Sequence, residues 1–108
     1  MERATVEART VGDVQVVTIR GEIDLSNATE VRDGIGHLAS DDVSVIMVDL
    51  SQTDYLDSSG IAMLFRLAER LGHRRQELRL VVPPDAPIRT ALELTNLPKA
   101  IAVQDALG

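Results

Sequence analysis

A short apolar run followed by a long amphipathic segment constrains the fold most. The run is VSVIMVDL at 43–50, and the amphipathic segment SSGIAMLFRLAERLG follows it at 58–72. Because the run is β-branched and nearly unbroken in hydrophobicity, it is typical of a strand buried on both faces of a sheet. A strand, a crossover helix and a further strand usually form a right-handed parallel unit. The pair therefore predicts an α/β fold.

The remaining segments alternate between strand-like and helix-like patterns. β-Branched or alternating runs predict strands at 4–10, 14–23, 77–82 and 100–104. Apolar residues at helical spacing predict helices over 24–38 and 85–97, and the polar stretch 51–55 is expected to be a loop. The predicted order is β β α β α β α β. We expect one α/β domain over 1–108, with helices packed against a mixed sheet of about four to five strands, the first two of them antiparallel.

Capping residues indicate where two of the helices begin and end. Ser26 or Asn27 can cap the first helix, and Asp85 or Ala86 stands near the start of the third. Asn96 tolerates the left-handed conformation and is expected to end the third helix. The core positions expected of the first helix are Ala28, Val31, Ile35 and Leu38.

The composition excludes several classes of protein. With 44% apolar residues the chain should fold, and with 2% aromatic residues its core must be aliphatic. A net charge of −6 disfavours a nucleic-acid partner, because no basic face is available to bind phosphates. The longest apolar run is far shorter than the ~20 residues that span a membrane. Charges in the first ten residues argue against a signal peptide, so we expect a cytoplasmic protein.

Catalytic and metal-binding patterns are missing from the sequence. There is no G-x-S-x-G elbow and no Gly-rich phosphate loop. The chain has no cysteine, and its two histidines, His37 and His73, lie far apart near predicted helix ends. We expect neither an enzyme nor a bound cofactor or metal ion.

The tetrapeptide Asp57-Ser58-Ser59-Gly60 stands at the start of the central helix. Such residues commonly cap helices, and one serine hydroxyl is expected to do so while the other stays available. The turn follows the carboxyl end of a buried strand, where open α/β sheets bind ligands. A phosphate added here would be tolerated, because free N–H groups and the helix dipole favour negative charge.

The helix after this turn presents a core-facing stripe and a possible contact patch. The residues expected to face the core are Ile61, Leu64, Phe65 and Ala68. Met63 and Leu67 lie off that stripe and are interpreted as an apolar patch for a partner; partial burial is the alternative, weighed equally for Leu67. Arg66 and Arg70 are expected on the solvated outer face.

Three blocks carry a resemblance to a known family. They are RGEIDLSNA at 20–28, VIMVDLSQTDYLDSSGIAML at 45–64 and IRTALELTNL at 88–97. The chain resembles the STAS domain and, within it, the stand-alone bacterial anti-sigma factor antagonists. The resemblance implies that Ser58 (alternatively Ser59) is phosphorylated by a serine kinase that is also an anti-sigma factor. The unphosphorylated antagonist binds that kinase and releases a sigma factor, and a PP2C-like phosphatase resets the cycle.

The resemblance also implies a set of partner-binding residues. Asp24 matches a family acid near the phosphorylated serine, and Gly60 is expected to let a partner approach closely. The predicted set is Asp24, Asp57, Ser58, Ser59, Gly60, Met63 and Leu67. Two alternatives stay open: a subunit of a larger STAS assembly, either stressosome-like or transporter-associated, and a nucleotide-binding STAS module. A weak homodimer is possible.

Overall fold

The computed structural model describes residues 4–107; Glu2 and Arg3, two of the charged residues among the first ten that argue against a signal peptide, lie outside this part. The strands are β1 (Thr5–Val11), β2 (Val14–Ile23), β3 (Val45–Asp49), β4 (Thr53–Leu56), β5 (Glu77–Val81) and β6 (Ala102–Gln104). The helices are α1 (Ala28–Leu38), α2 (Ser58–His73), α3 (Arg89–Glu93) and α4 (Leu97–Ala100). Every strand predicted from the sequence is present.

The strands form a single mixed sheet in the order β1-β2-β3-β5-β6, with β4 paired to β2. The pair β1–β2 is antiparallel, and all other neighbours are parallel. This confirms the predicted mixed α/β sheet. Gly12 has a φ of +61°, a conformation that glycine adopts without strain, in the turn between the first two strands.

Strand β4 was not expected, since the sequence predicted a loop at 51–55. It runs parallel to the end of β2, on the same side as β3, and brings the sheet to six strands. Buried Thr53 donates its hydroxyl proton to the carbonyl oxygen of Ile19 at 2.9 Å. A bulge in β2 at Gly21, whose φ is +105°, adjusts the register. Residues 51–55 have the local composition of a loop, but these long-range hydrogen bonds hold part of this stretch as a strand.

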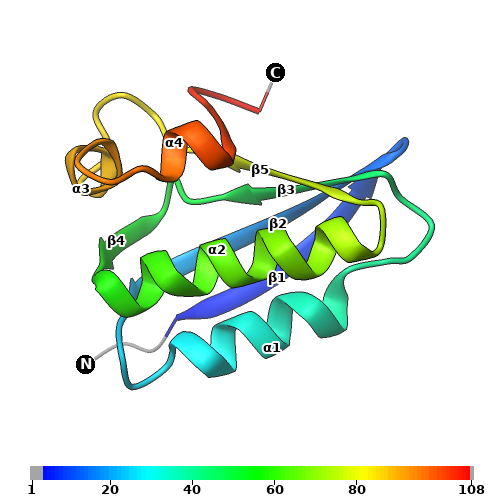
Figure 1. Cartoon of the computed structure of the whole chain (residues 1–108), viewed down its shortest axis with the longest axis horizontal. Helices are drawn as coiled ribbons and strands as arrows, with labels where there is room; N and C mark the ends of the chain where they lie inside the picture. The colour runs from blue at the N-terminus through cyan, green and yellow to red at the C-terminus, as the bar shows by residue number, and fades with distance from the viewer. Residues whose placement is uncertain (1–3, 108) are drawn as a thin grey trace.

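Helices α1 and α2 lie side by side over one face of the sheet (Figure 1). Their buried side chains meet the inward-facing residues of β2, β3 and β5. This main core includes Val17, Ile19, Ile46, Val48, Leu80, Val31, Ile35, Leu64, Leu67 and Leu71. A smaller cluster of Val16, Met47 and Val81 lies on the other face, so β3 is buried on both faces, as predicted.

The core-facing stripe of α2 differs from the predicted one. Met63 is 4% and Leu67 0% exposed, so the prediction that they lie off the stripe is wrong. Phe65, expected in the core, is 36% exposed. The buried positions of the helix are Gly60, Met63, Leu64, Leu67 and Leu71. The apolar stripe is therefore centred on Leu64 and Leu67 and turned away from Phe65.

Helix α1 begins after Asn27, one of the two predicted capping residues, although the Asn27 side chain does not cap it, and the helix buries Ala28, Val31 and Ile35. Leu38 was also expected in the core, yet it is 41% exposed. It is the last residue of the helix, and Gln15 donates a side-chain hydrogen bond to its carbonyl oxygen at 2.8 Å. The helix therefore ends on a polar contact.

The helix predicted over 85–97 is divided in two, and neither Asp85 nor Ala86 caps it. Helix α3 has five residues and α4 four. The Thr95 hydroxyl donates to the carbonyl oxygen of Leu92 at 2.7 Å and accepts from the N–H of Leu97 at 3.1 Å, which closes α3 and starts α4. Asn96 has a φ of −84°, so it does not adopt the left-handed conformation.

Candidate functional site

Asp57, rather than a serine, caps helix α2. Its Oδ1 accepts hydrogen bonds from the backbone N–H groups of Ser59 at 2.9 Å and Gly60 at 3.1 Å. The expectation that one serine hydroxyl caps the helix is therefore wrong. Within residues 4–107, the hydroxyl groups of Ser58 and Ser59 form no hydrogen bond.

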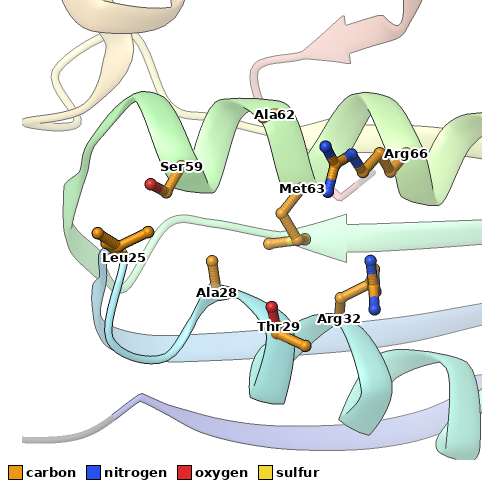
Figure 2. A pocket seen from close by; sticks show the side chains of 8 residues that line it. All are labelled: Leu25, Ala28, Thr29, Arg32, Ser59, Ala62, Met63 and Arg66. Carbon is orange, nitrogen blue, oxygen red and sulfur yellow. The ribbon is translucent and has the colours of Figure 1, made fainter.

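The two serines differ in their surroundings. Ser58 is exposed and is the first residue of α2, while Ser59 is half-buried. Figure 2 shows the Ser59 side chain directed toward the loop that carries Leu25. A molecule approaching from solvent can therefore reach the Ser58 hydroxyl, whereas the Ser59 hydroxyl faces a second segment of this chain.

The loop between β2 and α1 is fixed beside the cap. The backbone N–H of Leu25 donates to Asp57 Oδ2 at 3.2 Å, and the N–H of Asp57 donates to the carbonyl oxygen of Ile23 at 3.3 Å. Asn27 holds this loop with its amide group, which donates to the carbonyl oxygen of Glu22 at 2.8 Å and accepts from the N–H of Asp24 at 2.9 Å. Asn27 thus occupies the N-cap position of α1 without capping it.

Asp24 lies in the same loop and carries a stabilised negative charge. Its Oδ1 accepts hydrogen bonds from the hydroxyl and the N–H of Ser26. The Ser26 hydroxyl is the main cause that holds the pKa of the Asp24 carboxyl below its usual range, and backbone N–H groups add to it. The structure therefore brings the loop of Asp24 next to the Asp57 turn, and both carboxylates lie at this end of the sheet.

Gly60 is buried and serves the packing of this chain. A β-carbon at Gly60 would lie 2.2 Å from Leu56 Cδ1 and 3.2 Å from Ile23 Cγ2. The absence of a side chain thus lets the first turn of α2 sit against the ends of β2 and β4. The role of Gly60 in the approach of a partner stays a prediction.

A pocket of about 230 Å³ opens between α1 and α2, next to this turn (Figure 2). Its lining residues are Leu25, Ala28, Thr29, Arg32, Ser59, Ala62, Met63 and Arg66. Arg32 was not singled out from the sequence, whereas Arg66 is exposed, as predicted. Their proximity is not visible in the sequence, because the two residues lie on separate helices.

Two further findings concern the described part of the chain. Among residues 4–107, no group of three or more His, Asp or Glu side chains is arranged to hold a metal ion. In the same part, every helix is too short or too polar to cross a membrane. Both histidines lie at or near helix ends, as predicted.

Loss of the Asp57 cap is expected to destabilise the protein modestly. Asp57→Ala should lower the free energy of unfolding by about 1 kcal/mol, because two N–H groups of α2 lose their acceptor. Urea unfolding followed by circular dichroism measures the change. Asp57→Asn keeps an acceptor oxygen and should lose less than half as much; Asp54→Ala, on the exposed face of β4, is the control. Equal losses in all three variants would contradict the assigned cap.

The model of the STAS domain matches residues 5–108. The chain belongs to the STAS domain family. This confirms the resemblance seen in the three sequence blocks, and it accounts for nearly the whole chain. The Asp57-Ser58-Ser59-Gly60 turn therefore lies within a STAS domain.

Three known proteins are similar to this chain. The anti-sigma-F factor antagonist RsfB of Mycobacterium tuberculosis is 34% identical over 68 residues, which cover 63% of this chain and 56% of that protein, little more than half its length. Sulfate transporter 3.2 of Arabidopsis thaliana is 33% identical over 107 residues, covering 88% of this chain and 16% of the transporter. The crystal structure of an anti-sigma factor antagonist from Mycobacterium paratuberculosis has a TM-score of 0.84 at 28% identity, covering 97% of this chain and 88% of that one.

Proposed function

We propose that this STAS domain is an anti-sigma factor antagonist whose binding is switched by phosphorylation of Ser58. The observation that carries the proposal is the exposed hydroxyl of Ser58, which makes no hydrogen bond within residues 4–107 and stands on the first turn of α2. The similar antagonists from two mycobacteria support it. In this proposal the chain acts by binding in the cytoplasm, without catalysis of its own.

The unphosphorylated surface binds an anti-sigma factor that is also a serine kinase, and the sigma factor is released. Phosphate adds about −1.5 to −2 charges at Ser58. Because Asp57 already satisfies the N–H groups of Ser59 and Gly60, the phosphate can project from the first turn without breaking the cap. A PP2C-like phosphatase removes it and restores binding.

Repulsion and desolvation explain why the phosphorylated form does not bind. The phosphate would join the carboxylates of Asp57 and Asp24 at one end of the sheet. Covering three like charges with a partner removes their hydration and brings them against the same surface. Asp24, Ser58 and Ser59 remain proposed contact residues, whereas Met63 and Leu67 pack inside the domain.

The position of the phosphate tests this proposal directly. Incubation with ATP and the anti-sigma factor kinases of the source cell should place phosphate on Ser58, as mapped by mass spectrometry. Ser58→Ala should remain unmodified, while Ser59→Ala should be phosphorylated as the wild type is. Full modification of Ser58→Ala would move the site elsewhere, and a wild type that no such kinase binds or modifies would overturn the function.

The match to a sulfate transporter favours a second candidate, a STAS region that works within a transporter assembly. The two functions predict different native complexes. Size-exclusion chromatography of cell extract, followed with an antibody, separates a small kinase–antagonist pair from a membrane-bound assembly.

A further inference from the structure

The pocket between α1 and α2 combines cationic and apolar side chains in a chain that is acidic overall. Figure 2 shows Arg32 on α1 and Arg66 on α2 at one end of the pocket, and Leu25 with Ser59 at the other. Ala28 and Met63 line the part between them. With a net charge of −6, the chain supplies two guanidinium groups to a small pocket without placing a carboxylate among its lining residues.

Both guanidinium groups have unused hydrogen-bond donors. The Nε of Arg32 is buried and has no hydrogen-bond partner, and the only ion pair of this residue in the described part is a 3.4 Å contact with Asp33. Arg66 is exposed and forms no ion pair within residues 4–107. The outer guanidinium nitrogen atoms of the two side chains, unlike the buried Nε, can therefore donate to an anionic oxygen that enters the pocket.

The rim of the pocket indicates a protein as the occupant. Leu25 is 82% exposed beside the pocket, so a protein that binds here can also bury this apolar side chain. Its backbone N–H is bonded to Asp57, and Ser59 lines the pocket, so the pocket continues the surface around Ser58. A small free anion would use the guanidinium groups and leave Leu25 in water.

We infer that the α1–α2 pocket receives an acidic side chain of the protein partner, flanked by an apolar side chain that covers Leu25. Arg32 and Arg66 bind the carboxylate, and the Ser59 hydroxyl stands at the opposite end of the pocket. The inference deepens the proposed function and depends on it. The binding surface is then negative at Asp24 and Asp57 and positive in the pocket, which fixes the orientation of the partner.

Charge reversal in the pocket tests the inference with the anti-sigma factor kinase that phosphorylates the wild type. Arg66→Glu should weaken binding roughly 10- to 100-fold by isothermal titration calorimetry, because a like charge replaces an opposite one. Arg32→Gln should also weaken it and reduce its dependence on salt. Arg9→Glu, an equal charge change on exposed β1, should bind within about twofold of wild type. Thermal melts identify variants that do not fold, and Arg66, being exposed, is the safer position.

The outcomes separate this inference from the function that it deepens. If Arg66→Glu and Arg32→Gln bind as Arg9→Glu does, while the wild type is bound and phosphorylated, the pocket has no such role and the proposed function stands. If no kinase binds the wild type, both fail. Saturable shifts of pocket resonances in ¹H–¹⁵N spectra on titration with inorganic phosphate or ATP would assign the pocket to a small phosphorylated ligand and overturn the inference.

Discussion

Ser58→Asp is expected to fold like the wild type and to bind the anti-sigma factor roughly 10- to 100-fold more weakly. The new carboxylate stands on the exposed first turn of α2, where the helix dipole favours it, so stability should change little. In the proposed complex the same charge would be covered together with Asp57 and Asp24. Calorimetric titration measures the affinity, and urea unfolding measures the stability.

A neutral substitution at the same position separates the effect of charge from that of side-chain size. Ser58→Asn has nearly the volume of aspartate without its charge and should retain most of the affinity. The phosphorylated wild type carries more charge than aspartate and should bind more weakly still. Loss of affinity in Ser58→Asn equal to that in Ser58→Asp would show that crowding, rather than charge, controls binding.

Leu67→Ala is expected to lower the free energy of unfolding by about 2–5 kcal/mol. Leu67 is fully buried in the main core, so truncation removes apolar contacts and leaves a cavity under α2. Chemical unfolding gives the value, and for a domain of this size it is a large part of the total stability.

Phe65→Ala is the matched control on the same helix. Phe65 is 36% exposed, and its truncation should change stability by about 1 kcal/mol or less. A Leu67→Ala protein that unfolds like the wild type but binds the partner weakly would place Leu67 at the interface, as the sequence interpretation proposed, and would contradict the buried position.

The sequence predicted the elements whose signals are local. The apolar run of β3, the alternation in β5 and the apolar spacing of α1 each occur within one segment, and all are found in the structure. The stripe of α2 was misassigned although its signal was present. Leu64, Leu67 and Leu71 recur at three- and four-residue spacing, which marks the buried face better than a stripe through Phe65.

Features that depend on distant segments could not be predicted. Strand β4 exists because Thr53 and Gln52 bond to Ile19 and Gly21, more than thirty positions earlier in the chain. The pocket unites residues of α1 and α2 that no local pattern relates. The cap by Asp57 was missed for a different reason: Asp57, Ser58 and Ser59 are all common capping residues, and backbone geometry decides which of them occupies the N-cap position.

Strands β2 and β4 run parallel and end side by side. The Asp24 loop and the Ser58 turn therefore leave the sheet at the same end, where they are hydrogen-bonded to each other. Because hydrogen bonds hold both segments, a phosphate on Ser58 is not expected to move the backbone. Under the proposed function, the phosphorylated and unphosphorylated proteins should therefore share one backbone and differ in the charge at Ser58. A partner would then distinguish the two forms by surface charge and not by backbone shape.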